Sequence, residues 1–374
     1  MSEWKTYRLG EICSRIKSGK GISAQKIAPI GEYPVIGGNG VRGYTSITNF
    51  NGECAVVGRQ GAYCGNVRFF SGSAYMTEHA VVIVGNELVD TRYLAYLLSV
   101  MQLGNLSAQS AQPGLSVQTL SKLIVSIPDL STQRRIAGLL GALDDKIELN
   151  RRINANLEAQ AQALFKSWFV DFEPFRDGPF VDSELGKIPQ GWKVGGIYTY
   201  MDVIYGAPYK SALFNTDKKG YPLIRIRDLK TYSPQFYTEE ILPNTEYVDF
   251  GDIVAGMDAE FVPYIWKGEK GLLNQRVCKF IPKYDCVSKY YILSLIRPEL
   301  EFVQSYKVGT TVSHLGKSDI DKFKVITPPA EIVKRFSCIV DSFHQQIIKL
   351  AKENFKLSAL RDTLLPRLMA GEKM

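Results

Sequence analysis

The stretch IAGLLGALDDKIELNRRINANLEAQAQALFKSW, residues 136–168, decides the fold because its apolar residues recur with a helical period. Steps of four and three residues alternate along it without a break, which is the heptad pattern of a coiled-coil seam. The seam positions are Ile136, Leu140, Leu143, Ile147, Asn150, Asn154, Leu157, Ala161, Leu164 and Trp168. The sequence therefore predicts one long helix with a largely apolar stripe.

The same pattern occurs a second time, at a constant offset of 200 residues, because the stretches that begin at Val125 and Val325 align without a gap. The second seam consists of Phe336, Val340, Phe343, Ile347, Leu350, Asn354, Leu357, Arg361, Leu364 and Leu368. Two unrelated amphipathic helices, each packed on its own domain, are the plain alternative. The shared period, length and offset favour two helices that bury each other as an antiparallel coiled coil.

The facing residues of such a pair follow from symmetry. With the midpoints of the two helices opposed, Asn150 lies against Asn354 and Asn154 lies against Leu350. A polar residue in a seam lowers stability but specifies the register. The two asparagines of the first helix are thus expected to fix how the helices align.

The ends of both helices carry recognisable signals. Ser131 or Thr132 is the expected cap of the first helix. Pro174 is expected to stop that helix, and Pro366 is expected to interrupt the last turn of the second. The 39 residues from Ser131 to Phe169 correspond to a helix about 58 Å long at ~1.5 Å per residue.

The segments before the two helices are different in kind. Short apolar runs separated by glycines predict β-strands with glycine turns. The runs are CAVVG (54–58), VRFF (67–70), AVVIVG (80–85), YPLIRIRDL (221–229), GDIVAGM (251–257), PYIWKG (263–268) and RVCKFI (276–281). Each segment opens at a tryptophan, Trp4 or Trp192, and this offset of 188 makes the second globular segment 12 residues longer.

These features predict an α+β fold with a pseudo-two-fold internal repeat. Two globular mixed α/β domains alternate with two long helices that pack as an antiparallel coiled coil. The expected boundaries are 1–130 for the first globular domain and 131–173 for the first helix. A linker with the second globular domain follows at 174–326, and the second helix occupies 327–374.

Composition narrows the class of protein. A net charge of +7 permits a polyanionic partner without demanding one. The N-terminal residues are charged and no apolar run has membrane-spanning length, so a cytoplasmic protein is expected. The six cysteines, at positions 13, 54, 64, 278, 286 and 338, form no C-x-x-C pair. With only three histidines beside them, no metal site is expected, and the thiols are expected to be reduced and mostly buried.

The stretch GGNGVRGY fits G-x-G-x-x-G at Gly38, Gly40 and Gly43 but lacks the context of a dinucleotide site. Such a loop lies between a strand and a helix, whereas the residues that follow here are β-branched and punctuated by asparagine and glycine. Glycines between short strands are typical of tight turns. We expect Arg42 at the tip of this turn, with Tyr44 beside it.

Other catalytic signatures are missing from the sequence. The G-K-S at 316–318 has no glycine five residues before its glycine-lysine pair, which a P-loop requires. Neither a zinc-protease helix motif nor a nucleophile elbow occurs. This pattern favours a binding or scaffolding protein over an enzyme.

Basic and amide side chains recur in the turns of both globular segments, and such side chains contact base edges and phosphates in DNA. The candidate DNA-binding residues of the first segment are Arg42, Tyr44, Arg59, Gln60, Tyr63, Asn66 and Arg68. Those of the second segment are Lys210, Arg225, Arg227, Lys230, Asn274, Gln275, Arg276, Thr310, Thr311, Ser313 and His314. Each residue alone is ordinary for a surface, but the repeated set indicates nucleic-acid binding.

The alternation of globular segment and long helix resembles the specificity (S) subunits of type I DNA restriction–modification systems, over essentially the whole chain. The residues that carry the resemblance are W-x-x-x-x-L-G-E-I at Trp4–Ile12, SELGKIPQGW at Ser183–Trp192, and the entries into the helices at Pro128 and Pro328. The loops GGNGVRGY and VGRQGAYCGNV are also similar to the target recognition domains of that family.

This resemblance implies that each globular segment is a target recognition domain that reads one half of a split sequence in double-stranded DNA. The two helices would hold the domains apart and set the spacing of the half-sites. Two adenine-N6 methylase (M) subunits, which use S-adenosylmethionine, would join the chain, as would restriction (R) subunits, which use ATP and Mg²⁺. The chain itself would supply specificity, with no catalytic residue and no cofactor of its own.

Two other classes of function stay open from the sequence. A stand-alone DNA-processing enzyme, such as a nuclease with an unrecognised site, would be active as the purified chain. A purely structural coiled-coil adaptor would not bind DNA even at low salt.

Overall fold

The computed structural model describes residues 4–107, 114–258, 260–307 and 314–372. The chain divides into two compact units. Unit 1 comprises Met1–Ile147 and Leu357–Met374, and unit 2 comprises Glu148–Lys356. Each unit therefore contains a part of each long helix. Because these divisions fall inside the helices, the four predicted domain boundaries stay a prediction.

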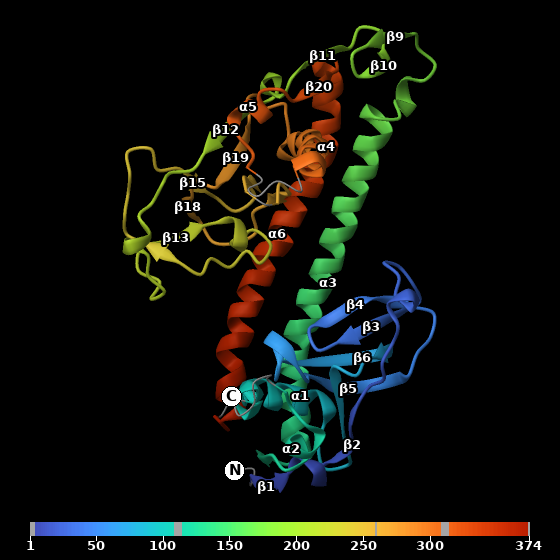
Figure 1. Cartoon of the computed structure of the whole chain (residues 1–374), viewed down its shortest axis with the longest axis vertical. Helices are drawn as coiled ribbons and strands as arrows, with labels where there is room; N and C mark the ends of the chain where they lie inside the picture. The colour runs from blue at the N-terminus through green and yellow to red at the C-terminus, as the bar shows by residue number, and fades with distance from the viewer. Residues whose placement is uncertain (1–3, 108–113, 259, 308–313, 373–374) are drawn as a thin grey trace. The chain divides into compact units, whose positions relative to one another are not determined.

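The two long helices are α3, Leu130–Phe169, and α6, Ala330–Met369 (Figure 1). All ten seam positions of each helix are buried or half-buried. In unit 1, Ile136 and Leu140 share a core with Leu368. In unit 2, Phe165 of α3 meets Phe336 of α6 edge-on, with ring centroids 5.9 Å apart. The predicted heptad seam and the antiparallel pairing are confirmed within each unit.

The polar seam residues set the alignment. The side-chain amide of Asn150 donates to Oδ1 of Asn354 over 2.9 Å, which confirms this predicted pair. Asn154 donates to the carbonyl oxygen of Ile347 over 3.4 Å, and its expected placement against Leu350 stays a prediction. An apolar side chain accepts no hydrogen bond, and the amide therefore reaches a backbone oxygen of the facing helix.

Unit 1 has a charged counterpart to this asparagine pair. Arg361, which stands at a seam position of α6, donates to Asp144 of α3 over 2.8 Å. The same carboxylate accepts a hydrogen bond from the Tyr96 hydroxyl. A seam arginine is thereby accommodated, because both its charge and the carboxylate opposite have partners.

The helix ends differ in part from expectation. The N-terminal cap of α3 is Asp129, which accepts from the backbone N–H of Thr132, so neither Ser131 nor Thr132 is the cap. The helix ends at Phe169, before Pro174 is reached. Pro366 does not interrupt α6, which continues to Met369. Proline costs a helix one hydrogen bond and a steric adjustment, and α6 accommodates both in its last turn.

Unit 1 is built on a six-stranded sheet in the order β2-β7-β5-β6-β3-β4, in which only β3 and β6 run parallel among the described strands. Its strands are β2 (Cys13–Ser18), β3 (Tyr33–Gly37), β4 (Gly40–Thr45), β5 (Phe50–Gly58), β6 (Val67–Met76) and β7 (Ala80–Gly85). Unit 1 also contains the helices α1 (Thr91–Val100) and α2 (Val117–Ser121), which follow the last strand of this sheet in the chain. Strand β1 (Lys5–Arg8) pairs separately with β8 (Ile124–Ile127), directly before α3.

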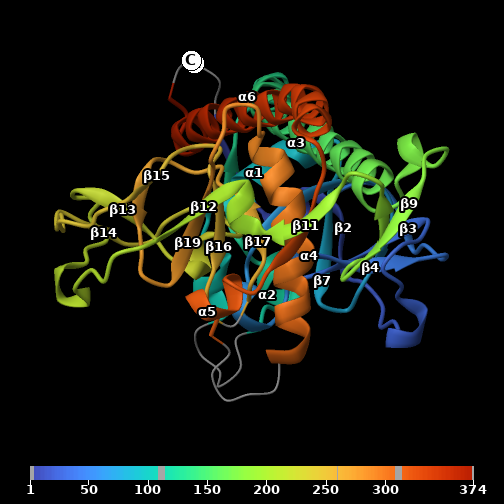
Figure 2. The same cartoon turned by 90° about the horizontal axis from the view of Figure 1, so that it is seen from above.

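Unit 2 carries two four-stranded sheets, β12-β19-β16-β17 and β14-β13-β18-β15. Their strands are β12 (Met201–Tyr205), β13 (Tyr221–Ile224), β14 (Tyr237–Thr238), β15 (Tyr247–Val248), β16 (Ile253–Gly256), β17 (Pro263–Ile265), β18 (Gly271–Leu273) and β19 (Val277–Pro282). A hairpin of β9 (Phe180–Ser183) and β10 (Gly186–Pro189) lies in the linker. Figure 2 shows α4 (Lys289–Lys307) beside the first sheet, and the two share one core.

The internal repeat extends to the elements around each sheet. Strand β11 (Lys193–Gly196) pairs with β20 (Lys324–Thr327) directly before α6, as β1 pairs with β8 before α3. The short helix α5 (Lys317–Ile320) takes the place that α2 has in unit 1. The predicted strand runs are confirmed except in the second half of YPLIRIRDL, because β13 ends at Ile224 and a 3-10 helix follows at Ile226–Asp228. Helices α1 and α4 were not predicted.

The cysteines are free in all six positions. Cys54 and Cys278 are buried, but Cys286 and Cys338 are exposed, so the expectation of mostly buried thiols was wrong. The described residues contain no group of three metal-ligating side chains placed to hold an ion. Within the same residues, every helix is either too short or too polar to cross a membrane.

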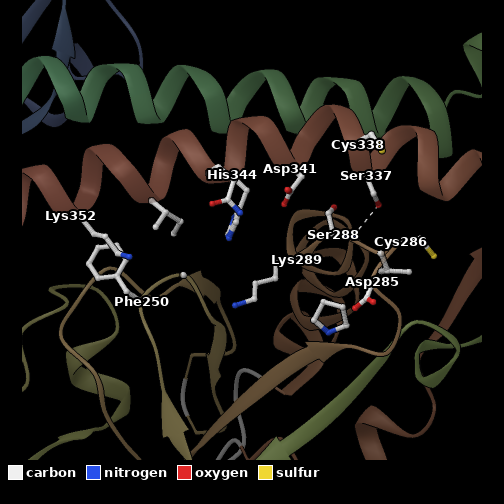
Figure 3. A pocket seen from close by; sticks show the side chains of 15 residues that line it. Phe250, Asp285, Cys286, Ser288, Lys289, Ser337, Cys338, Asp341, His344 and Lys352 are labelled. Atoms are coloured by element: carbon white, nitrogen blue, oxygen red, sulfur yellow. Dashed lines mark hydrogen bonds between the residues drawn. The ribbon is translucent and has the colours of Figure 1, made fainter.

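His344 of α6 is a buried titratable group of unit 2, with 3% of its surface exposed. It lines a hollow of about 420 Å³ with Phe250, Lys289 and Asp341 (Figure 3). Burial, and then the charge of Lys289, lowers the pKa of His344 to about 4, although Asp341 and Asp252 act in the opposite direction. The imidazole is therefore neutral at pH 7.

Acidification is expected to destabilise unit 2 through His344. A histidine in the unfolded chain has a pKa of about 6.5. Below this pH the unfolded chain therefore binds a proton that folded unit 2 does not bind until the pH approaches 4. The contribution is fully present above about pH 6.5, falls as the pH drops toward 4, and is on the order of 3 kcal/mol. Urea unfolding at about pH 7 and about pH 5 measures it. His344→Gln should flatten this pH dependence, and an unchanged slope in that variant contradicts the assignment. His79→Gln, at a half-buried histidine of unit 1, is the control.

Candidate nucleic-acid interface

The turn between β3 and β4 is held by a side chain from another strand. Arg68 of β6 donates to the carbonyl oxygen of Asn39 over 2.6 Å and to its side-chain oxygen over 3.2 Å. Gly40 has a φ of +105°, and a Cβ there would stand 2.1 Å from the Arg68 guanidinium. Glycine at position 40 therefore serves both the turn and the arginine that braces it.

Arg42 does not stand at the tip of this turn, as the sequence suggested. It lies inside β4, and its stem packs against Gly37, where a Cβ would come within 2.8 Å of Arg42 Cδ. The tip is formed by Gly38 and Asn39, because only these two residues separate the paired strands. Arg42 and Tyr44 are nevertheless both exposed.

A second loop, between β5 and β6, lies against the first. The backbone N–H of Gly58 donates to Asn66, and that of Gly65 donates back to Gly58, which closes the loop. Gly38 of the first turn approaches Gly58 so closely that a Cβ would lie 3.3 Å from its Cα. The structure thus brings both predicted loops of unit 1 together, with Gln60, Tyr63 and Asn66 exposed. We call this combined surface, residues 38–44 and 59–68, the turn surface of unit 1.

Charge on this surface is largely uncompensated. Neither Arg42 nor Arg59 forms an ion pair with a described residue, whereas Arg68 is engaged with Asn39. Arg59 is held by its backbone, which donates to the carbonyl oxygen of His79 over 2.9 Å. Fixed loops with free guanidinium groups suit contacts to an anionic ligand.

The arginines of unit 2 are arranged differently. Arg225 stacks over the ring of Phe236 at 4.2 Å from its centroid, and its Nε lies 3.5 Å from Asp228. Burial raises the pKa of Asp228, although hydrogen bonds from Arg225 and its charge oppose the shift. Arg225 is half-buried and therefore supports the turn as much as it offers a contact. Arg227 is exposed and forms no ion pair within the described residues.

Two further cations of unit 2 are paired with acids. Lys230 lies 2.9 Å from Glu260. Arg276 and His314 both contact Asp258, over 3.4 Å and 2.6 Å respectively. These contacts bring together segments that are far apart in the sequence, and they neutralise part of the local charge.

The remaining candidate DNA-binding residues of unit 2 differ in their exposure. Asn274 is only 8% exposed, and its side chain accepts from the backbone of Arg276 over 3.4 Å, so it holds a turn and does not present its amide for base contact. Gln275 is exposed. Lys210 is exposed too, and its backbone donates to Glu240. Thr310, Thr311 and Ser313 lie outside the described residues.

Sequence reasoning missed the residues that position these cations. Asn39, Phe236 and Asp258 each fix an arginine on the list of candidates. The G-N-G run around Asn39 was a local signal for a turn residue with backbone bonds. Phe236 and Asp258 contact residues 11 and 18 positions away, respectively, and no local pattern identifies such partners.

Comparisons with known proteins agree with this architecture. A family described as the type I restriction modification DNA specificity domain matches residues 1–159 and 192–356. These two segments cover most of the chain, and each contains one globular part with much of the helix that follows it. The chain therefore belongs to this family, which confirms the resemblance stated from the sequence.

Individual relatives are similar over most of their length. The chain is 30% identical over 323 residues to the type I restriction enzyme MjaIX specificity subunit of Methanocaldococcus jannaschii, covering 78% of this chain and 71% of that one. It is 27% identical over 333 residues to the HindI specificity subunit of Haemophilus influenzae, covering 70% of this chain and 71% of the relative. The crystal structure of a type I S subunit from M. genitalium has the same fold, with a TM-score of 0.58, 16% identity, and coverage of 98% of this chain and 96% of that one.

The bracing of the β3–β4 turn gives a direct test of the turn surface. Gly40→Ala is expected to cost backbone strain and to displace Arg68 from Asn39. Gly52→Ala is the matched control, because Gly52 also has a positive φ, +125°, but a Cβ there meets nothing within 4 Å. Gly40→Ala should lower the free energy of unfolding by about 1.5–3 kcal/mol more than the control, the contribution of a hydrogen bond to a charged group. Adding Arg68→Ala to Gly40→Ala should change little. Full additivity of the two substitutions in urea unfolding contradicts the brace.

Proposed function

We propose that this chain is the specificity subunit of a type I restriction–modification complex and that it reads a bipartite sequence in double-stranded DNA. Each globular part reads one half of the target. The paired helices keep the two readers at a fixed separation and thereby set the gap between the halves. The observation that carries this proposal is the duplicated pattern of reader and helix in a chain that belongs to the specificity family.

The candidate surfaces support a role in DNA recognition. Guanidinium and amide groups on rigid turns are the groups that read base edges in the major groove. Arg59 and Arg42 are free cations on fixed backbone in unit 1, and Arg227 is the exposed counterpart in unit 2. The two units also differ in their loops and charges, as expected if each half of the target has its own sequence.

The proposal extends to partners and location. Two methylase subunits with S-adenosylmethionine, and restriction subunits with ATP and Mg²⁺, would supply the chemistry, and this chain would direct them without catalysing any step. The chain needs no catalytic residue for this role, because binding and positioning are sufficient to select a site on DNA. A protein with this role acts on cellular DNA, and we propose the cytoplasm as its location.

The experiment that tests this function uses the chain in complex with a methylase (M) subunit of a type I system that assembles with it. Selection from a pool of randomised duplexes should enrich two short sequences separated by a gap of fixed length. Methylation of adenine should then depend on both sequences. The chain alone, rigorously purified, should transfer no methyl group and cut no DNA.

Single substitutions should affect one half of the enriched target. Arg59→Ala is expected to weaken binding to the target by ~1–3 kcal/mol if Arg59 contacts a base, and to relax specificity only in the half read by unit 1. Arg227→Ala should do the same for the other half. Arg134→Ala, at an exposed arginine of α3, is the control and should leave both halves unchanged. Binding is measured by titration with target and with random duplex.

Three outcomes contradict the proposal. Cleavage by the purified chain favours a stand-alone nuclease. Absence of DNA binding by the complex at low salt favours a structural adaptor. Enrichment of one continuous sequence, without a gap, shows that the two globular parts do not read separate halves.

A further inference from the structure

Strand β2, at the edge of the unit 1 sheet, borders a hollow of about 810 Å³ that none of the candidate residues lines. Arg15, Lys17 and Lys20 line one side, and Thr48 and Asn49 line the other. No acidic side chain is among the lining residues, all of which the structure describes. We call this hollow the β2 trough.

The backbone at the end of β2 is fixed against the turn after β6. Gly19 donates to the carbonyl oxygen of Ala80, and Lys20 donates to that of Met76, both over 3.0 Å. A Cβ at position 19 would stand 2.1 Å from the Met76 oxygen, so only glycine allows this approach. Lys20 is therefore held in place by its backbone, while its side chain stays exposed.

The opposite wall is rigid because its polar groups are already engaged. The Thr48 hydroxyl donates to the carbonyl oxygen of Ala74 over 2.8 Å. The Asn49 amide donates to the Met76 carbonyl oxygen over 3.0 Å and accepts from its N–H over 2.8 Å. This wall gives the trough its shape and leaves ligand contacts to the basic side.

The basic side, in contrast, has unused groups. Arg15 lies over the ring of Phe50 at 5.4 Å, and its Nε is buried without a hydrogen bond to any described residue. The Ser18 hydroxyl is buried and lacks a partner in the same sense. Lys17 and Lys20 form no ion pair within the described part of the chain. Buried donors without partners are costly, so a ligand with several acceptor oxygens would relieve them.

Acidic groups near the trough do not cancel this charge. Glu78 is the acid that approaches its rim, with a carboxylate oxygen 3.8 Å from where a Cβ of Gly21 would be. Its other oxygen lies 3.3 Å from His79. Three cations therefore line the trough, and no acidic side chain does.

Unit 2 lacks the equivalent cluster of cations, so this cluster is not a requirement of the fold that the two units share. At the offset of 188 residues that relates the two opening segments, Arg15, Lys17 and Lys20 correspond to Val203, Tyr205 and Pro208. Strand β12 keeps the position of β2, and none of the three corresponding residues is a cation. A charge cluster that the fold itself required would appear in both copies.

We infer that the β2 trough binds phosphate groups of the DNA backbone beside the half-site read by unit 1. This inference rests on the proposed function and adds a second, sequence-independent surface to it. Phosphate contacts fix the register and orientation of a protein on the duplex without reading bases. The trough then orients the turn surface of unit 1 on its half-site. Unit 2 has no corresponding cluster of cations at β12.

The test compares two double variants of the complex with the methylase subunit. Lys17→Gln with Lys20→Gln removes two charges from the trough at exposed positions, where folding should not suffer. Lys5→Gln with Lys122→Gln removes two charges from exposed positions of the same unit outside it. Dissociation constants are measured on the selected target and on random duplex over a range of salt concentrations.

The trough variant should bind both duplexes about tenfold or more weakly, by the same factor on each. Its dependence of log K on log salt should become shallower by about 1.8, from ~0.9 per lost phosphate contact. The control variant should match the wild type.

Three results would overturn the inference. One is an unchanged affinity and salt slope in the trough variant, and a second is an equal loss in the control. The third is a loss confined to the selected target, which would make these lysines base readers. If instead the wild-type complex itself shows no preferred sequence, it is the proposed function that fails. The two failures are therefore distinguishable.

Discussion

The seam between α3 and α6 is the interaction on which the rest of the structure depends, because neither unit is complete without a portion of both helices. The core of unit 1 contains Ile136 and Leu140 of α3 together with Leu368 of α6. The core of unit 2 contains Phe165 and Phe336 from the same two helices. Separation of the helices would expose apolar surface in both units, at roughly 25 cal/mol for each Å². The helices are therefore part of the two folds and not merely a spacer between them.

Polar seam residues turn this apolar contact into a defined alignment. The bond between Asn150 and Asn354 gives the side-chain nitrogen of the buried Asn150 an acceptor on the facing helix. The ion pair between Arg361 and Asp144 does the same in unit 1. A shift by one heptad would leave these groups unpaired, so each unit selects the same register independently. A repeat that evolves different readers needs such a fixed frame.

The two units differ in how they hold their cations. In unit 1, Arg42 on β4 and Arg59 on the β5–β6 loop form no ion pair with a described residue, and the β2 trough adds further uncompensated charge. In unit 2, Arg225, Lys230 and Arg276 are each paired with an acid. Contacts that paired cations make with DNA weaken less as the salt concentration rises, because the charge of these cations is already partly neutralised. Such contacts depend more on shape and hydrogen bonding than on net charge. The two halves of the target are therefore expected to be read with different balances of electrostatic and directional contacts.

Much of this could be predicted from the sequence because it rests on periodicity. The heptad steps, the offset of 200 and the pairing of Asn150 with Asn354 all follow from regular helix geometry. Contacts between residues far apart in the chain could not be predicted in this way. Arg42 was expected at the tip of a turn that Gly38 and Asn39 form instead. Asn274 was expected at the surface but is buried. Helix α4 was missed because its apolar residues are buried on several sides and show no clean amphipathic stripe.

One measurement tests the central claim that the helix pair sets the gap between the half-sites. Seven residues, one heptad, are inserted between Ile147 and Glu148 in α3 and seven more between Lys356 and Leu357 in α6, at the boundaries of the two units. Both insertions preserve the phase of the seam, and each lengthens its helix by about 10 Å at ~1.5 Å per residue. Duplex DNA rises ~3.4 Å per base pair. The gap in the selected target should therefore widen by about three base pairs while the two half-sequences stay the same. A folded, DNA-binding variant that selects the original gap would contradict the account.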